Sequence, residues 1–469
     1  MQILPLISCV RGFSGFASEQ HLASPDGKII IMVSDDGGLR YRVEVDGQPL
    51  LKQSWLGLEF TGGVTLGLNA KIEKAQQSHH DGIWENHFGK RSIARDCWNQ
   101  LQLTLVESDQ PQRRFGMILR AYDDGVALRY DLSKGPGLEE FVLNRELTEF
   151  AFADDYRCWA GDQSSCAESQ YLERTLSTIP QHYDLKDGKS ERYKGVLPLL
   201  VQAPQCYAAV AESNLLDWAG MFITGTGSST VLASRGDGNG CVVSEAPRVS
   251  PWRVLIMARA AGDLVSSELI ANLATPSQTS NTSWIKPGIS AWDPWWTDID
   301  PHLPEIRGVS SRGDTLADQD YIDLAADMGW SYQVVDWLWY QNCTSYDIAL
   351  NVGGKNPERP PVDFSKASSG VDMPALLAHA KERGVRLILW LHSYDLERHG
   401  IEKASKLFSD WGVAGLKIDF MNSDSQETVA WHERVIKLKL APAAGYAAML
   451  SKAKQLLKAF QPKILESNL

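Results

Sequence analysis

The sequence lacks any apolar run as long as a membrane-spanning helix, which needs roughly 18 to 20 residues. Positive charge is also scarce: 46 Lys and Arg stand against 58 Asp and Glu, so the formal net charge is −12 and the pI is near 5.4. Nucleic acid binding requires a basic surface for the phosphates, and this balance therefore argues against a nucleic-acid partner. An acidic balance places no limit on sugar binding.

The start of the chain lacks the basic residues that open an export signal. Residues 1–10 are largely apolar, but Arg11 follows them directly, and Gly15 to Ser18 can be read as a small-residue cleavage site. Two interpretations of residues 1–21 therefore stay open. They are either the remnant of an export signal, which goes with a periplasmic or secreted protein, or the ordinary start of a cytoplasmic protein.

Cysteine is sparse, with seven in 469 residues, and none belongs to a closely spaced pair typical of metal sites. Cys158 and Cys166 are near enough in sequence to close a small disulfide loop in an oxidising compartment. The alternative is two buried thiols without a bond.

Tryptophan, by contrast, is abundant, with 16 in the chain. Several lie where strands are predicted to end, among them Trp292, Trp337 and Trp390. An indole packs against the C–H face of a sugar ring, and its N–H reaches a hydroxyl. Core packing is the alternative for each one, but their clustering indicates a sugar-binding edge.

Residues 22–274 have the pattern of an antiparallel β domain. Short alternating or apolar runs, such as residues 28–33, 39–45 and 101–106, are separated by Asp-Gly turns. Many short strands at this rhythm predict a large antiparallel β-sandwich. The polar stretch from Thr275 to Ser283 predicts a linker over residues 275–286.

From residue 287 the rhythm changes to strand, helix, strand. Apolar strands are predicted at residues 288–293, 332–337, 386–392 and 415–420, with helices at Thr315 to Met328, Met373 to Arg383 and Ile401 to Trp411. Alternation of this kind predicts parallel strands with right-handed crossovers, as in a (β/α)8 barrel of the TIM type. Only four strands are recognised, so residues 287–436 are predicted to form the first half of an incomplete barrel. Residues 437–469 are expected to be a divergent tail with a helix from Ala441 to Phe460.

Taken together, a set of motifs in this order resembles glycoside hydrolase family 97, the bacterial calcium-dependent α-glucosidases and α-galactosidases. The resemblance runs from Ser24 to about Arg434 and implies an N-terminal antiparallel β-super-sandwich followed by a (β/α)8 catalytic barrel. It rests on SPDGK (24–28), LGL (56–58), FGKR (88–91), RAYDDGV (120–126), SWIKPG (283–288), AW (291–292), VDW (335–337), LILWLH (387–392), GLKIDFM (415–421) and QE (426–427).

The resemblance assigns chemistry to the last of these strands. Asp419 ends the strand at the edge where barrel enzymes place catalytic groups, and in the retaining, α-galactosidase-like branch of the family an Asp at this position is the nucleophile. The alternative is an Asp that caps the following helix. Lys417, two residues earlier on the same face, is predicted to contact a sugar hydroxyl or to pair with Asp419.

His392 and Asp336 end neighbouring strands and are predicted, with Trp337 and Trp292, to contact the substrate; a structural imidazole is the alternative for His392. The resemblance further implies that Glu168 is a calcium ligand, the alternative being a solvated Glu, and that the protein is exported.

The general acid and the other calcium glutamates of the family lie on later strands. The resemblance therefore predicts a retaining hydrolase of terminal α-galactosides or α-glucosides that, as this chain, has weak or no activity. The alternatives are a non-catalytic carbohydrate-binding protein and a gene remnant.

Overall fold

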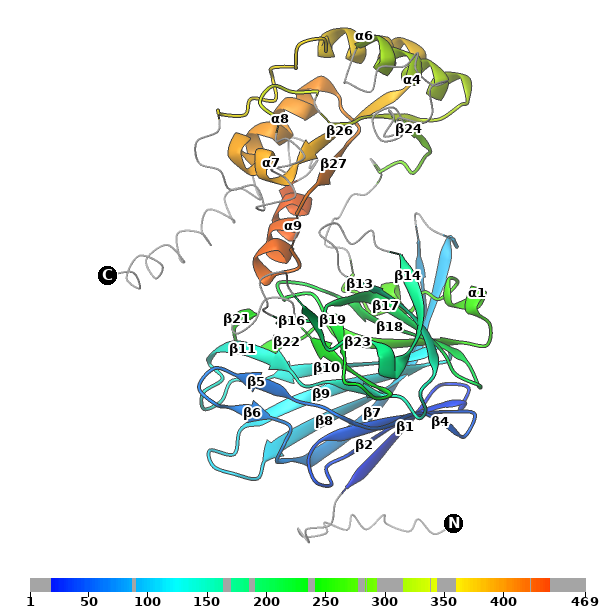
Figure 1. The fold of residues 1–469 in the computed structure, drawn as a ribbon, viewed down its shortest axis with the longest axis vertical. Helices are drawn as coiled ribbons and strands as arrows, with labels where there is room; N and C mark the ends of the chain where they lie inside the picture. Colours follow the sequence, from blue (N-terminus) through cyan, green and yellow to red (C-terminus); the bar gives the residue numbers. More distant parts are fainter. Residues whose placement is uncertain are drawn as a thin grey trace, which may run out of the picture. The chain divides into compact units, whose positions relative to one another are not determined.

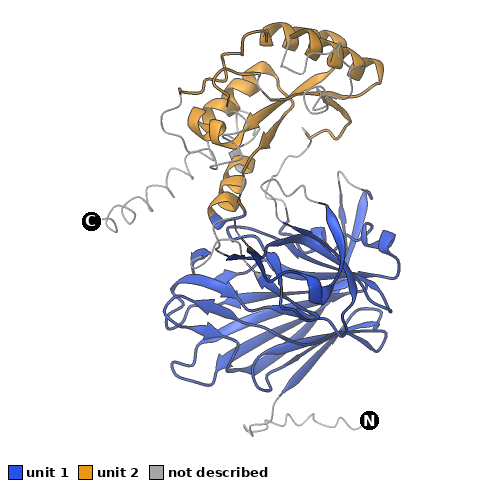
Figure 2. Cartoon of the chain, viewed as in Figure 1, with its two compact units in different colours: residues 1–276, 424–426 blue, residues 277–423, 427–469 orange. Residues whose placement is uncertain are grey.

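The computed structural model describes residues 18–86, 90–162, 170–184, 190–234, 241–276, 283, 285–292, 315–337, 339–343, 360–421 and 423–438. The chain divides into two compact units, residues 1–276 with 424–426 and residues 277–423 with 427–469 (Figure 2). The first unit is rich in antiparallel β-structure, and the second is α/β (Figure 1). Each is described below by itself.

The first unit opens with a small antiparallel sheet in the order β1-β2-β3-β4. Asp46 and Gly47 both have positive φ, 51° and 73°, which is the backbone that a tight two-residue hairpin turn requires. The Asp-Gly turn predicted at this place therefore joins β3 to β4. The strands of this sheet are β1 (Glu19–Ala23), β2 (Ile29–Ser34), β3 (Arg40–Val45) and β4 (Gln48–Trp55).

A large sheet forms the centre of the first unit, and its main path runs β12-β20-β19-β17-β18-β23-β10-β9-β8-β7. Strands β13, β14 and β22 pair at its side. Its strands are β7 (Ala70–Glu85), β8 (Ile93–Glu107), β9 (Arg114–Tyr122), β10 (Gly125–Leu132), β12 (Glu149–Ala151), β13 (Arg157–Asp162), β14 (Tyr171–Thr175), β17 (Gly195–Gln202), β18 (Tyr207–Ser213), β19 (Phe222–Gly225), β20 (Thr230–Ser234), β22 (Arg248–Val249) and β23 (Trp252–Ala258).

Two smaller sheets and three short helical segments complete the first unit. One sheet has the order β21-β11-β5-β6, and the other pairs β15 with β16. The elements are β5 (Leu58–Phe60), β6 (Thr65–Leu66), β11 (Glu140–Glu146), β15 (His182–Asp184), β16 (Ser190–Arg192), β21 (Val242–Glu245), the 3₁₀ turn η1 (Leu176–Thr178), α1 (Ala261–Leu264) and α2 (Leu269–Asn272).

Alternating side chains from the small and large sheets share one hydrophobic core. Ile31 and Val43 of the small sheet are buried in the same cluster as Leu103 and Met117 of the large sheet. A strand exposes alternate side chains on opposite faces, so the polar residues between them face outward. The opposite face of the large sheet holds a second cluster, in which Leu269 at the start of α2 packs with Val254.

The second unit contains a parallel sheet in the order β24-β25-β26-β27. The four predicted apolar runs form these strands, with ends trimmed by a residue or two. The three predicted helices are confirmed as α4, α6 and α8, whereas α7 and α9 were not predicted. The elements are β24 (Ser290–Trp292), α4 (Thr315–Asp327), β25 (Tyr332–Val335), α6 (Met373–Arg383), β26 (Arg386–His392), α7 (Ser393–His399), α8 (Ile401–Trp411), β27 (Gly415–Asp419) and α9 (Gln426–Leu438).

Local signals fix the helices that lead into β26 and β27. The Asp372 side chain caps α6 by accepting from the Ala375 N–H at 3.0 Å, and Pro374 occupies the first turn. Gly384 and Gly412 end α6 and α8 with left-handed φ of 72° and 74°. Each helix therefore stops just before an apolar strand, which delivers the carboxyl ends of β26 and β27 to the same sheet edge.

Some predicted features lie wholly or largely outside the described residues. These are residues 1–17 of the possible export signal, residues 277–282 and 284 of the linker, the tail from residue 439 onward, and the Glu168 and Cys166 positions. Cys158 is described: it is buried in β13, and this burial raises the pKa of its thiol to about 12. At neutral pH it is therefore a buried thiol rather than a reactive thiolate.

Candidate active site

Two carboxylates and one ammonium meet at the carboxyl edge of the parallel sheet. Asp336 follows β25, Asp419 ends β27, and Lys417 lies on the same face of β27 as Asp419. The Lys417 Nζ lies 2.9 Å from Asp336 Oδ2 and 3.7 Å from Asp419 Oδ2. The pairing predicted between Lys417 and Asp419 is present, but the shorter ion pair joins Lys417 to Asp336.

Both aspartates are held in the same way by a neighbouring strand. Asp336 Oδ1 accepts from the Trp337 N–H at 2.7 Å, and its Oδ2 accepts from the indole N–H of Trp292 on β24. Asp419 Oδ1 accepts from the Phe420 N–H at 2.9 Å, and its Oδ2 accepts from the indole N–H of Trp390 on β26 at 3.2 Å. Each carboxylate oxygen thus has its own donor.

Exposure distinguishes the two aspartates. The Asp419 side chain is 43% exposed, whereas the Asp336 side chain is 17% exposed. Lys417 has its ammonium 4.4 Å from the centre of the Trp292 ring, and that indole is itself 43% exposed. Asp419 is therefore the carboxylate open to a reactant, and Trp292 offers an apolar ring face beside it.

His392 has a structural role in this arrangement. It is fully buried, and its Nδ1 accepts from the Tyr394 N–H at 3.0 Å, which caps the start of α7. Its ring stacks on Phe420, with centroids 5.3 Å apart and planes at 14°. This placement favours the structural alternative for His392 over contact with a substrate.

Trp337 lies at the site edge and is partly buried, with its ring 5.8 Å from the Trp390 ring and 6.0 Å from the Phe420 ring. Trp390 is only 1% exposed, so it contributes its N–H and its packing rather than an open face. Asp419 does not cap a helix, because α9 begins only at Gln426.

The calcium ligand predicted at Glu168 lies outside the described residues. Within the part of the chain that is described, no three acidic, His or Cys side chains gather as a metal site would require.

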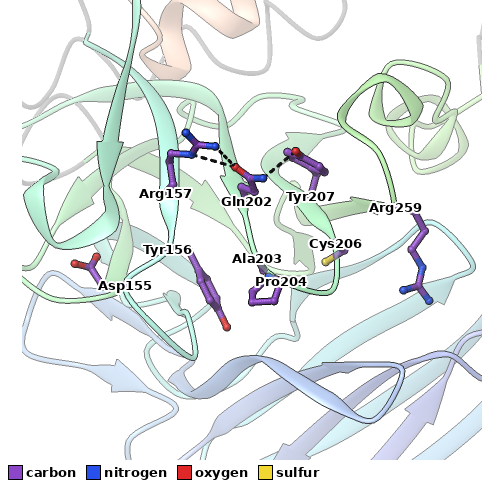
Figure 3. Close-up of a pocket in the computed structure, with 9 residues that line it drawn as sticks. All are labelled: Asp155, Tyr156, Arg157, Gln202, Ala203, Pro204, Cys206, Tyr207 and Arg259. Atoms are coloured by element: carbon purple, nitrogen blue, oxygen red, sulfur yellow. Dashed lines mark hydrogen bonds between the residues drawn. The ribbon is translucent and has the colours of Figure 1, made fainter.

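A separate cavity of about 440 Å³ belongs to the first unit (Figure 3). Its polar side chains bond one another: the Arg157 guanidinium donates to Gln202 Oε1 at 2.8 Å, and Gln202 Nε2 donates to the Tyr207 hydroxyl at 2.9 Å. Cys206 in its wall is buried, which raises the pKa of that thiol to about 11. The carboxylate in the cavity wall, Asp155, accepts from the N–H and the hydroxyl of Ser177 at 2.8 and 2.6 Å, and the cavity is not the candidate active site.

The described helices include none with the length and apolarity to cross a membrane. This agrees with the absence of long apolar runs in the sequence.

Two family models match the chain, and together they cover most of it. The model described as Glycosyl-hydrolase 97 N-terminal matches residues 22–276, and the model described as Glycoside hydrolase 97 matches residues 295–450. The chain belongs to the glycoside hydrolase 97 family. The resemblance inferred from the motifs is confirmed, and the second match continues past residue 436 into the segment expected to diverge.

Curated relatives of this glycoside hydrolase 97 chain include two bacterial proteins. It is 25% identical over 442 residues to the retaining alpha-galactosidase of Bacteroides thetaiotaomicron, covering 89% of this chain and 62% of the relative. It is 29% identical over 407 residues to a probable retaining alpha-galactosidase of Streptomyces bingchenggensis, covering 85% of this chain and 56% of the relative. The chain thus spans about three fifths of the length of these relatives.

Solved structures support the family fold. A glycoside hydrolase family 97 enzyme from Pseudoalteromonas sp. strain K8, in complex with acarbose, matches with a TM-score of 0.74 at 22% identity, covering 89% of this chain and 64% of that one. A beta-arabinopyranosidase matches with a TM-score of 0.70 at 20% identity, covering 91% of this chain and 65% of that one. A β-rich first unit followed by an α/β unit is therefore the arrangement of this family.

The motifs missed two contributors to the site. Trp390 was predicted as a sugar platform, but its indole N–H holds the carboxylate of Asp419 instead. Phe420 was only the residue after the strand, yet its N–H and ring contact Asp419 and His392. The only sequence signal was their position at the ends of β26 and β27, and the pairing of Trp390 opposite Lys417 comes from the strand register.

Proposed function

We propose that this family 97 protein is a retaining α-glycoside hydrolase of terminal α-galactosides. The observation that carries the proposal is Asp419, an exposed carboxylate at the carboxyl edge of the sheet with a fixed donor on each oxygen. The names of the two curated relatives support galactose over glucose. We also propose that β24 to β27 are the first four strands of a (β/α)8 barrel, as their parallel order and their family suggest.

In the proposed reaction Asp419 attacks the anomeric carbon. A carboxylate oxygen forms a bond to C1 while the bond from C1 to the leaving oxygen breaks, which gives a covalent glycosyl-enzyme. Water then attacks C1 from the opposite face and releases Asp419, so the anomeric configuration is retained. Lys417 balances the negative charge of Asp336 and Asp419 and is close enough to bond a sugar hydroxyl, while the Trp292 face packs against the ring.

A mechanism-based label tests this proposal directly. 5-Fluoro-α-galactosyl fluoride reacts with a retaining nucleophile: the C1–F bond breaks, fluoride leaves, and the glycosyl-enzyme accumulates. Mass spectrometry of the digested full chain should find one added sugar on the peptide that contains Asp419. Faster labelling by the glucosyl analogue would instead assign the protein to α-glucosides. Sugar binding by calorimetry without labelling would replace the proposal with the carbohydrate-binding alternative.

The chain is also proposed to depend strongly on the leaving group. A retaining glycosidase needs a second carboxyl group about 5 to 5.5 Å from the nucleophile to protonate the leaving oxygen. Among the described residues Asp336 is the carboxylate beside Asp419, and its Oδ2 already bonds the Lys417 ammonium and the Trp292 indole N–H. We therefore expect α-galactosyl fluoride, which needs no acid, to react roughly 10² to 10⁴ times faster than methyl α-galactoside. Comparable rates, measured by galactose release, would show that an acid is in place.

Lys417→Met provides a test of the charge balance at the site. Removing the ammonium leaves Asp336 and Asp419 to repel each other and removes a donor to the sugar. We expect the labelling rate to fall roughly 10²-fold. The matched control is Lys406→Met, which removes an exposed lysine paired with Asp410 on α8. If both variants label at the wild-type rate, Lys417 has no part in the reaction.

Calcium dependence is proposed from the family resemblance, with Glu168 as one ligand. A bound ion stabilises the folded state by RT ln(1 + c/Kd), where c is the free ion concentration, so the gain in free energy grows with the logarithm of the ion concentration above the dissociation constant. We expect the melting temperature of chelated protein to rise on addition of Ca²⁺ and the rise to shrink in Glu168→Gln. An unchanged melting temperature up to millimolar Ca²⁺ would argue against the site.

Export to the periplasm or medium is likewise proposed from the family resemblance, with the cytoplasm as the alternative. Fractionation of cells that express the full gene, followed by N-terminal sequencing, distinguishes the two. A cytoplasmic protein that retains Met1 would contradict export.

A further inference from the structure

The residue after the proposed nucleophile has an unusual backbone. Phe420 has φ of 60°, in the left-handed region. Glycine and asparagine adopt this conformation readily, but a bulky side chain does so only where its surroundings impose it. Strain of this kind concentrates at sites where geometry matters for function. The question is what holds Phe420 there and what its turn accomplishes.

The Phe420 turn is held from both of its ends. The ring stacks on the buried His392 ring at 5.3 Å and lies 6.0 Å from the Trp337 and Trp390 rings. The Phe420 carbonyl accepts from the Ser393 hydroxyl at 3.0 Å. His392 is in turn fixed as the cap of α7, so the end of β26 and the start of α7 together hold the turn after β27.

The peptide N–H at the Phe420 turn bonds the carboxylate of Asp419. The Phe420 N–H points to Asp419 Oδ1 at 2.9 Å, while the Trp390 indole N–H reaches Oδ2 at 3.2 Å. Donors from two directions leave the carboxylate little freedom to rotate. Asp336 has the same pair of donors from Trp337 and Trp292, but Trp337 is not among the residues with positive φ. The strained turn is therefore specific to the more exposed carboxylate.

We infer that Phe420 is a positioning residue: its left-handed backbone lets its ring and carbonyl be held by His392 and Ser393, which fixes the peptide group between Asp419 and Phe420, keeps its N–H on the Asp419 carboxylate and orients that carboxylate for attack. The inference rests on the proposed function of Asp419 for its kinetic effect, but the hydrogen bond itself does not. Its two parts are therefore tested separately, one without substrate and one with the galactosyl label.

The substrate-free test uses the full chain labelled with ¹⁵N-phenylalanine. The Phe420 amide signal is identified by its absence from the spectrum of Phe420→Tyr. We expect this signal to lie downfield, as the signal of an amide bonded to a carboxylate does, and to move upfield in Asp419→Ala, which removes both oxygens. An amide signal at the same position in the wild type and in Asp419→Ala would overturn the inference, whatever the activity of the protein.

The kinetic test compares variants by their maximal labelling rate, kinact, and the concentration for half-maximal rate, KI. Alanine at position 420 still has a Cβ that disfavours the left-handed φ, but it lacks the ring that imposes this φ, so the backbone of Phe420→Ala should relax to another conformation. We expect kinact to fall roughly 10- to 100-fold with KI unchanged. Phe420→Gly adopts the same φ without strain and should lose less, and Phe420→Tyr should recover most of the rate.

Phe364→Leu is the matched control, because it alters a buried ring of the same unit that packs on Trp339, Tyr340, His399 and Phe408. It should lower the melting temperature and leave kinact as it is. Wild-type kinact in Phe420→Ala, or a loss confined to KI, would overturn the positioning role. Absence of labelling in the wild type, with the amide signal behaving as expected, would reject the proposed function and leave the orienting contact established.

Discussion

An Asp419→Asn variant is expected to lose on the order of 10⁴ to 10⁶ in the rate of fluoride release from α-galactosyl fluoride, the scale seen when a catalytic nucleophile or its partner is removed from an enzyme. The amide is nearly isosteric with the carboxylate, but its single oxygen can accept from only one of the Phe420 and Trp390 donors. It cannot form the covalent bond to C1. Because the Asp419 side chain is 43% exposed, the loss of rate should come with only a small change in melting temperature.

The control for Asp419→Asn is Asp410→Asn, which neutralises an exposed carboxylate of α8 that pairs with Lys406. It should label and turn over like the wild type. Asp419→Gly adds a positive signature, since azide can enter the space left by the side chain. The azide nitrogen bonds to C1, the C1–F bond breaks, and β-galactosyl azide forms. Activity retained in Asp419→Asn, or an α-azide from Asp419→Gly, would contradict a retaining mechanism through Asp419.

The second unit was predictable because each of its strands is a continuous apolar run. Residues 386–392, for example, are buried on both faces, so their hydrophobicity needs no alternating partner to be recognised. The helices were found by spacing, and Asp372, Gly384 and Gly412 mark their ends. The edge that carries the candidate nucleophile followed from position, because a parallel sheet brings its carboxyl ends to one edge, and the role of Asp419 came from the family resemblance.

The contacts of the site were not predictable, because they depend on the strand register and on the direct connection of β26 to α7. The prediction paired Lys417 with its neighbour in sequence, whereas the sheet order places Asp336 of β25 closer to its ammonium. Helix α7 begins directly after β26, and the His392 side chain that caps it was therefore interpreted as a strand end facing substrate. A strand end and a helix cap look alike in sequence when no turn residues separate them.

In the first unit the sequence predicted β-structure but not its order. Strand β10 pairs with β23, more than a hundred residues later in the chain, and β23 pairs with β18. No local pattern specifies such partners. A buried cluster of charged residues joins β11, β18 and β23, and in the sequence its members are three polar positions with no visible relation.

Arg253 is the centre of that cluster, and its replacement is expected to have the largest effect on stability. Its side chain is fully buried; its guanidinium donates to both oxygens of Glu146 at 2.7 and 2.6 Å and to Glu212 at 2.8 Å. Burial acts to lower the pKa of Arg253, but the paired Glu146 and Glu212 carboxylates raise it above its usual value. Arg253→Met leaves Glu146, itself 1% exposed, without its cation. Loss of one partner from a buried pair costs about 3–5 kcal/mol.

Urea unfolding, followed by the fluorescence of the buried Trp252 and Trp218, would measure the loss. The matched control is Arg114→Met, which removes a bidentate Arg–Glu pair from the same sheet, but one that is exposed and faces Glu73. Water screens such a pair, so this variant should unfold close to the wild-type midpoint. Adding Glu146→Leu to Arg253→Met should recover part of the loss, because it removes the orphaned charge. If Arg253→Met unfolds at the same urea concentration as Arg114→Met, the cluster does not hold β11, β18 and β23 together.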